Sequence, residues 1–283
     1  GALFALFQAW LDPFDEVLVP DPGFLAYPIL ARLSGAVSVP YPLGPDGSFD
    51  AGAFEASLAA HPFAKAAVMN HPANPTGAGA TVQDFERASR ACEAREVLLL
   101  SDEVYGELHL GSRPPSLADA SSKGVVLGSL SKAWGAPGLR VGWAIADPEI
   151  LAPARLVHNY MVTSLARPSQ DAAIALLKAS SEILPAARSE LAARWAALSE
   201  SLREELGISC ELPSGAFYYW LPLPEAARAD PTAFCLRVRD EGGVITVPGI
   251  AFGERGRGHA RLSYAAAPDS IKEGVRRLAP FWR

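Results

Sequence analysis

With 283 residues, the chain is long enough to bury a large core and to form one large domain and a smaller one. Hydrophobic residues make up 49% of the sequence, which excludes a disordered protein, and the net charge of −6 argues against a nucleic-acid partner. We find no signal peptide and no apolar run long enough to cross a membrane, and Cys92, Cys210 and Cys235 lack metal-binding spacing, so we expect a cytoplasmic protein with no metal site.

The first half of the chain alternates short apolar strands with amphipathic helices. We expect helices at 2–11, 24–33, 50–60 and 81–93, and strands at 16–20, 36–40, 65–70, 97–100, 125–127 and 141–146. Asp50 and Thr81 have the residue types of helix N-caps. This alternation predicts an α/β domain whose mixed, mostly parallel sheet is sandwiched by helices.

The second half of the chain follows a different pattern. Helical stretches extend to 159 and over 167–179, 185–206, 232–241 and 270–278, with short strands at 216–223, 244–247 and 261–264. We therefore predict a large domain over 1–184 and a smaller α+β C-terminal domain over 185–283. The chain opens inside an apolar helical pattern at Ala2, so we expect further residues ahead of Gly1.

Residues 127–143 place Lys132 between two apolar runs. Desolvation disfavours a charged ammonium, and a neutral lysine amine condenses with an aldehyde to a Schiff base. The hydroxyls of Ser129 and Ser131 and the guanidinium of Arg140 are donors suited to a phosphate. Together they indicate pyridoxal 5′-phosphate (PLP). A polar loop with a solvated lysine is the alternative interpretation of this stretch alone.

Other polar residues also follow predicted strands, where ligands of open α/β sheets bind. Asn74 follows one strand, and Asp102 and Tyr105 follow another. Asp102 ends the apolar run VLLLSDE, so we expect its carboxylate to be partly buried and to need a partner. A pyridinium nitrogen is one such partner. An ordinary salt bridge or a helix cap is the alternative.

Taken in chain order, these motifs resemble those of the class I/II aminotransferases, which are fold-type I PLP enzymes. The resemblance depends on NPTG at 74–77, SDEVY at 101–105, SLSK at 129–132, and Arg140 eight residues after the lysine. NPTG and SLSK are each weak signals alone, whereas the whole set in this order is specific. It extends from about Leu6 to the C-terminus.

The resemblance implies roles for the polar residues at the strand ends. It identifies Lys132 as the residue that binds PLP covalently and then moves a proton as a base. Asp102 is implied as the partner of the pyridine nitrogen. Tyr105 and Asn74 are implied as the pair that hydrogen-bonds the 3′-oxygen of the ring. Ser129 and Arg140, with Ser131, are implied as phosphate ligands.

Two further positions match the family at a distance from this cluster. Phe24 lies where the family has an aromatic ring stacked on the cofactor, although a core aromatic on a helix is the alternative. The run ARLSY at 260–264 matches the family's arginine for the substrate α-carboxylate, which selects Arg261 over Arg255 and Arg257. Asn74 is expected to contact the substrate as well.

The chain departs from the family pattern at its start. The family's glycine-bearing turn, which offers backbone N–H groups to the phosphate, would lie ahead of Gly1. The resemblance also implies a homodimer, because relatives build each site at a subunit boundary.

The sequence thus predicts a PLP-dependent aminotransferase that moves an amino group from an amino acid to a 2-oxo acid by a ping-pong route. A PLP-dependent C–S (β) lyase shares every motif named above and is the first alternative. A PLP-binding sensor domain of a transcription regulator is the second, although the chain lacks the basic surface expected of one.

Overall fold

Six strands from the first half of the chain form one sheet in the computed structural model, which describes residues 1–282. The strands are β1 Glu16–Asp21, β2 Val37–Pro42, β3 Ala64–Asn70, β4 Leu98–Asp102, β5 Val125–Ser129 and β6 Gly142–Ile145. Their order is β2-β1-β3-β4-β5-β6, and every pair is parallel except β5–β6. The mixed, mostly parallel sheet predicted from the sequence is therefore confirmed.

Helices cover both faces of this sheet. They are α1 Ala2–Trp10, α2 Ala26–Leu33, α3 Ala51–Ala60, α4 Val82–Glu93, α5 Leu117–Ala120 and α6 Pro148–Val162. Successive residues of β3 point to opposite faces. Ala66 and Val68 pack with residues of α1, α2 and α6, whereas Ala67 and Met69 pack with residues of α3, α4 and α5. Burial on both sides explains why these strands read as continuous apolar runs.

Local side-chain bonds start the helices as expected. The Asp50 carboxylate accepts the Ala53 N–H at 2.9 Å, and Thr81 forms a reciprocal capping box with Asp84. These caps satisfy N–H groups that the first turn of a helix leaves unpaired.

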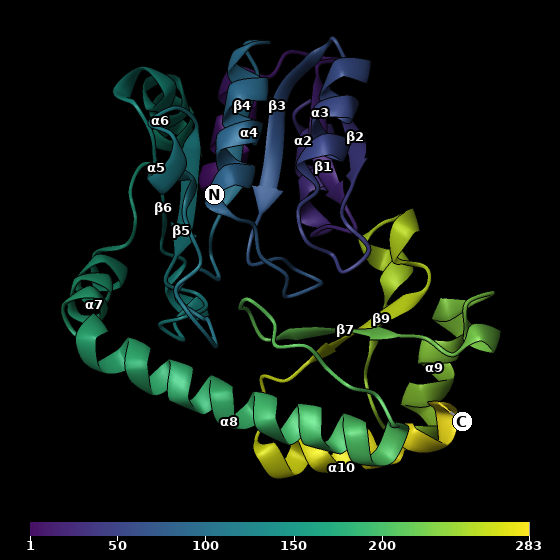
Figure 1. Cartoon of the computed structure of the whole chain (residues 1–283). Coiled ribbons are helices and arrows are strands. Elements are labelled where there is room, and N and C mark those ends of the chain that lie inside the picture. Colours follow the sequence, from purple (N-terminus) through teal and green to yellow (C-terminus); the bar gives the residue numbers. More distant parts are fainter. Residues whose placement is uncertain (283) are drawn as a thin grey trace.

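The second half of the chain builds a smaller α+β unit. Its elements are α7 Arg167–Lys178, α8 Ser180–Leu206, β7 Tyr218–Pro222, α9 Pro231–Gly242, β8 Val247–Pro248, β9 His259–Ser263 and α10 Pro268–Trp282, with short 3₁₀ turns at η2 Glu225–Ala227, η3 Gly249–Phe252 and η4 Glu254–Gly256. A further 3₁₀ turn, η1 Pro137–Leu139, lies between β5 and β6 of the large sheet. The antiparallel sheet has the order β7-β9-β8. Helix α8 runs along the lower edge of the molecule in Figure 1 and passes without a break through Leu184, the predicted domain boundary.

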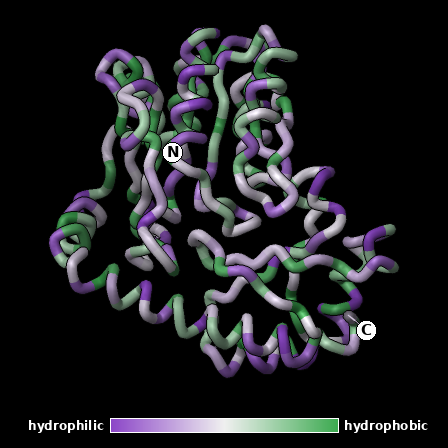
Figure 2. Tube along the Cα trace, in the orientation of Figure 1, coloured by the Kyte–Doolittle hydropathy of each residue, from purple (hydrophilic) through white to green (hydrophobic). Residues whose placement is uncertain are grey.

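The small sheet has one apolar and one polar face. Leu262 and Tyr264 point into a core that also contains Trp195 of α8. Figure 2 shows hydrophilic (purple) and hydrophobic (green) residues alternating along α8, as expected of a helix with one face on this core. Arg261, one residue away, points to the opposite face of the sheet. Figure 1 shows the arrowheads of the parallel strands directed toward this small sheet. The polar face therefore meets the strand ends at which ligands of α/β sheets bind.

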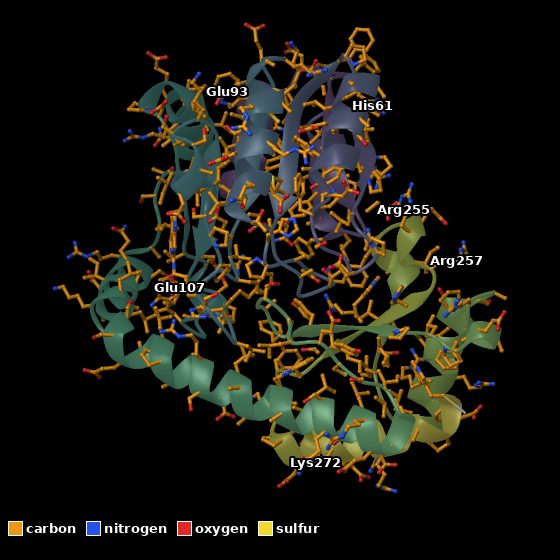
Figure 3. All side chains as sticks on the ribbon, in the orientation of Figure 1. His61, Glu93, Glu107, Arg255, Arg257 and Lys272 are labelled. Atoms are coloured by element: carbon orange, nitrogen blue, oxygen red, sulfur yellow. The ribbon has the colours of Figure 1, made fainter. Side chains whose placement is uncertain are left out.

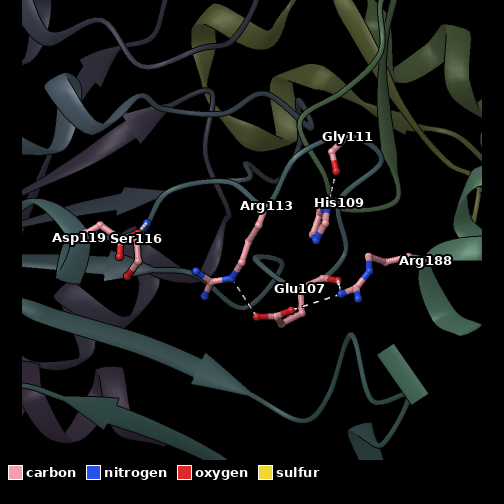
Figure 4. A network of polar contacts seen from close by, with 7 residues as sticks. All are labelled: Glu107, His109, Gly111, Arg113, Ser116, Asp119 and Arg188. Carbon is pink, nitrogen blue, oxygen red and sulfur yellow. Dashed lines mark hydrogen bonds and ion pairs between the residues drawn. The ribbon is translucent and has the colours of Figure 1, made fainter. Parts of the chain in front are cut away.

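The loop after β4 is tied to helix α8. The Glu107 carboxylate lies 3.4 Å from Arg188 of α8 and 3.2 Å from Arg113, a network drawn in Figure 4.

Among residues 1–282, no helix is long and apolar enough to span a bilayer, and no group of three His, Cys, Asp or Glu side chains is placed to hold a metal ion.

Candidate active site

Asp102 ends strand β4 with its carboxylate facing a cavity of about 670 Å³. The Tyr27 hydroxyl donates to one carboxylate oxygen at 2.8 Å, and the Val104 N–H lies 3.3 Å from the other. Burial raises the pKa of Asp102, while the hydrogen bonds from Tyr27 and Val104 oppose the rise. The carboxylate is thus desolvated and held in one orientation. A buried carboxylate of this kind is suited to bind a cationic or proton-bearing group of a ligand.

Lys132 lies on the loop that follows β5. Its Nζ is 5.4 Å from the ring centre of Tyr105 and 5.6 Å from that of Phe217. Burial lowers the pKa of Lys132, the charges of Arg261 and Arg140 lower it further, and Asp102 acts in the opposite direction. The amine therefore becomes a free nucleophile at a lower pH than an exposed lysine.

Ser129, Ser131 and Arg140 line the same cavity as Asp102, together with the N-terminal end of α1. Ser129 Oγ accepts the Ser131 N–H at 3.1 Å and lies 2.9 Å from Ser131 Oγ. Arg140 donates to the Pro137 carbonyl at 2.8 Å, and no carboxylate pairs with it within residues 1–282. Hydroxyls, an arginine and helix N–H groups converge here, which is a donor set suited to a phosphate.

Gly128 sets how closely this loop approaches Trp143. A Cβ at Gly128 would overlap the indole ring of Trp143, so Gly128→Ala must displace either the ring or the strand that leads to Ser129. We expect the variant to fold but to release PLP about tenfold more readily, because a shift of the loop weakens its phosphate donors. Equilibrium dialysis against PLP checks this, with Gly274→Ala on α10 as the control, since open space surrounds that position. Equal PLP affinity in both variants would contradict it.

Arg261 of β9 reaches across to the large sheet. Its Nη1 donates to Asn74 Oδ1 at 2.8 Å, and its guanidinium carbon lies 4.3 Å from the Tyr218 ring centre and 4.8 Å from that of Phe252. Its Nε is buried and has no partner among the described residues. A fixed guanidinium with an unused donor is prepared to receive a carboxylate.

The two neighbouring arginines do not take part. Arg255 and Arg257 are exposed, and Figure 3 shows both at the outer edge of the molecule. Arg257 pairs with Glu254 at 3.3 Å. The backbone N–H of Arg255 donates to the Asp21 carboxylate at 3.2 Å, but of the three arginines Arg261 is the one whose side chain is bonded to Asn74.

Asn74 and Asp102 are joined through a residue that the sequence analysis did not select. Asn70 accepts the Asn74 N–H at 2.9 Å and donates to the Asp102 carbonyl at 2.8 Å. Its place at the end of β3, as the first residue of the turn-rich NHPANPTG, was the available signal. From the sequence, Tyr27 is interpreted as a packing residue, because its hydroxyl partner Asp102 lies 75 positions away in the chain.

The remaining predicted residues lie around the same region. The Tyr105 hydroxyl is 3.1 Å from that of Tyr218, a third residue without an assigned role. The Phe24 ring is 36% exposed and packs edge-on against Tyr27 at 5.6 Å between ring centres. Hence the predicted residues form one connected group around Asp102, Lys132 and Arg261, with Phe24 at its margin.

Comparisons with known proteins identify the family of this chain. The profile of the family described as Aminotransferase class I and II matches residues 1–278. An LL-diaminopimelate aminotransferase of Dehalococcoides mccartyi is 30% identical, with 96% of this chain and 71% of that protein covered. An arginine–pyruvate transaminase of Pseudomonas aeruginosa is 31% identical, with 98% of this chain and 71% of that protein covered. The solved aspartate aminotransferase from Thermus thermophilus with maleate has a TM-score of 0.90 at 32% identity, covering 99% of this chain and 73% of its own.

The fold and the site thus define a PLP-dependent transferase of fold type I. The chain belongs to the aminotransferase class I and II family, and it is a PLP-dependent aminotransferase that uses amino acid and oxo acid substrates. The named relatives are aminotransferases, which supports this activity over the lyase alternative.

Proposed function

We propose that the connected group around Lys132 binds PLP and the amino acid, and that the protein carries out ping-pong transamination there. Asp102 would pair with the pyridine nitrogen, and Ser129, Ser131 and Arg140 would hold the phosphate. Arg261 would bind the substrate α-carboxylate with Asn74. The observation that carries the proposal is the contact series from Lys132 through Tyr105 and Tyr218 to Arg261, which joins the nucleophile to the carboxylate receptor.

The residues fit PLP in charge and in kind. A buried carboxylate with a raised pKa matches a pyridinium, and a cavity wall with two hydroxyls and an arginine matches a phosphate dianion. When bound, PLP supplies an electron sink that makes the Cα proton of an amino acid acidic. Phe24 would contribute an aromatic contact at the margin.

The proposed task of Lys132 is to form the covalent bond to the cofactor and, once released, to carry the Cα proton. Its lowered pKa favours both, since a neutral amine can attack and can accept a proton. Asn74 Oδ1 is engaged by Arg261, so the amide nitrogen is left to donate toward the cofactor's 3′-oxygen. Tyr105 would be the second donor to that oxygen.

A half-reaction screen tests this proposal. Purified protein with PLP is mixed with single amino acids, beginning with aspartate, LL-diaminopimelate and arginine, which are the amino acids in the names of its relatives. We expect loss of the bound-cofactor absorbance with formation of pyridoxamine phosphate and the matching 2-oxo acid. Release of ammonia and pyruvate in their place would identify the lyase.

We further propose that the protein is a homodimer that associates through α6 and α7. Large apolar side chains are exposed along these helices: Leu156, Tyr160, Met161, Val162, Ile174 and Leu177. Several large exposed apolar side chains on two consecutive helices are typical of an interaction surface. Other residues of α6, including Arg155 and His158, line the cavity beside Ser129, so a second copy on this face would adjoin the site.

Tyr160→Glu is expected to weaken the dimer at least about 100-fold, because it places an unpaired charge in a dehydrated interface. Tyr160 is 84% exposed, so the change should not disturb the fold of one chain. Light scattering after size exclusion measures the mass. Ile245→Glu, at a site 79% exposed on the small unit, is the matched control. A variant with unchanged mass at every concentration would refute the interface.

The cytoplasm is the proposed location. All three cysteines are free, and Cys92 and Cys235 are buried, which suits a reducing compartment. Cell fractionation followed by detection of the chain tests this.

A further inference from the structure

Tyr218 touches two groups that belong to different parts of the candidate site. It lies on β7 of the small sheet with its side chain buried. Its hydroxyl is 3.1 Å from that of Tyr105, and its ring centre is 4.3 Å from the Arg261 guanidinium carbon. Tyr105 comes from the loop after β4, so Tyr218 links the large sheet to the proposed carboxylate receptor.

The backbone around Tyr218 fixes this position. The Ala216 N–H donates to the Leu108 carbonyl at 2.8 Å, and the Tyr264 hydroxyl donates to the Ala216 carbonyl at 3.1 Å. A Cβ at Gly215 would lie 2.5 Å from the Leu108 carbonyl oxygen, so glycine permits this close approach. The segment that leads into β7 and Tyr218 is therefore hydrogen-bonded to, and closely packed against, the loop that carries Tyr105.

The hydrogen bond between the two tyrosines can run in either direction, and each direction leaves a different hydroxyl proton free. Each hydroxyl has one proton. Within residues 1–282, Tyr105 Oη is the side-chain hydrogen-bond partner of Tyr218 Oη. If Tyr218 donates to Tyr105, the proton of Tyr105 remains available for a ligand. Burial, with Tyr218 adding to it, raises the pKa of Tyr105, so that hydroxyl stays protonated as a donor.

We propose that Tyr218 is a positioning residue that couples the two halves of the site: its hydroxyl directs the Tyr105 proton toward the cofactor oxygen, and its ring supports the Arg261 guanidinium. This inference rests on the proposed function, because it takes Tyr105 and Arg261 as cofactor and carboxylate ligands. A donor that itself accepts a hydrogen bond donates more strongly. A guanidinium over an aromatic face is attracted by the ring quadrupole and is restricted in orientation.

Two substitutions separate these two effects. Tyr218→Phe removes the hydroxyl and keeps the ring beneath Arg261. Tyr218→Leu removes both. The neighbouring Tyr219→Phe is the matched control, since Tyr219 points to the other face of β7 and packs against Trp195.

The experiment uses the PLP-loaded protein and two readouts besides turnover. The first is the pH titration of the bound-cofactor absorbance. The second is the affinity for maleate, a dicarboxylate that has no amino group to transfer, measured from the absorbance change that it causes. Circular dichroism and the urea midpoint confirm that each variant is folded.

For Tyr218→Phe we expect the absorbance transition to move to higher pH by about 0.5 to 1 unit, as loss of one hydrogen bond would produce, with kcat lowered about five- to tenfold. Its maleate affinity and KM should stay within about twofold of wild type. Tyr218→Leu should show the same shift and, in addition, bind maleate about tenfold more weakly. Tyr219→Phe should match wild type in both readouts.

The double variant Tyr105→Phe/Tyr218→Phe should titrate like Tyr105→Phe alone, because the second hydroxyl acts through the first. An unshifted Tyr218→Phe titration, an equal shift in Tyr219→Phe, or additive shifts in the double variant would each overturn the inference. If wild-type protein shows no bound-cofactor absorbance at all, the proposed function fails, and that result is distinct from the other three.

Discussion

Lys132→Ala is expected to lower kcat for transamination by at least about 1,000-fold, since it removes both the covalent attachment and the proton carrier. The variant should still bind PLP reversibly, because Asp102, Ser129, Ser131 and Arg140 are untouched. Lys132→Arg is the matched control: it keeps a long cationic side chain and has no nucleophilic amine. Single-turnover absorbance kinetics with excess amino acid measure the loss. Interconversion of the two cofactor forms at the wild-type rate in either variant would remove Lys132 from its proposed role.

Borohydride reduction followed by mass spectrometry adds a site-specific test. The chain has five lysines, and we expect PLP to be fixed to the peptide that contains Lys132. The lowered pKa of Lys132 predicts that capture of PLP by the apoprotein rises with pH at lower values than the ordinary range of a lysine amine. Capture of PLP mainly on Lys123 or on Lys272, which Figure 3 shows at the surface, would contradict the assignment.

Local chemistry made much of the fold predictable. Neighbouring residues determine the strands β3 and β4, through their apolar runs, and the helix starts at Asp50 and Thr81, through their capping side chains. A short stretch of sequence is therefore enough to predict each of them. The strand expected at 244–247 was placed too early: pairing to β9 begins at Val247. Val244 accompanies the end of α9 in the small core, which gives the segment its apolar character without a strand. The helix expected to start at Pro185 begins at Ser180, so Pro185 lies inside α8, where it has no N–H to donate to the Ser181 carbonyl.

The contacts of the candidate site were less predictable because they join distant parts of the chain. Arg261 and Asn74 are 187 positions apart, and Tyr218 and Tyr105 are 113 apart. Resemblance to a family supplied the identity of Arg261, whereas the bond to Asn74 depends on how β9 meets the end of β3. Tyr27 is an example: its position in a helix predicts a core residue, and its hydrogen bond to Asp102 becomes evident only in the folded structure.

Arg261→Ala is expected to raise the KM for amino acid and 2-oxo acid by about 100-fold or more, because truncating one partner of a buried charged contact costs roughly 2–5 kcal/mol. Arg261→Lys should still raise KM about tenfold, since an ammonium lacks the planar fork that can bind a carboxylate while retaining the bond to Asn74. PLP affinity should change little, because the proposed phosphate donors Ser129, Ser131 and Arg140 line the cavity beside Asp102, whereas Arg261 does not. Initial rates over a range of both substrates separate KM from kcat.

Arg255→Ala provides the control for charge, because this exposed arginine lies on the same segment and its side chain faces solvent. Its KM should equal that of wild type. If the Arg255 variant loses affinity while both Arg261 variants keep it, the carboxylate binds at the edge of the small unit and not at the strand ends. Loss of PLP in Arg261→Ala would instead show that Arg261 supports the cofactor through Asn74, because removal of the guanidinium leaves a buried amide oxygen without its donor.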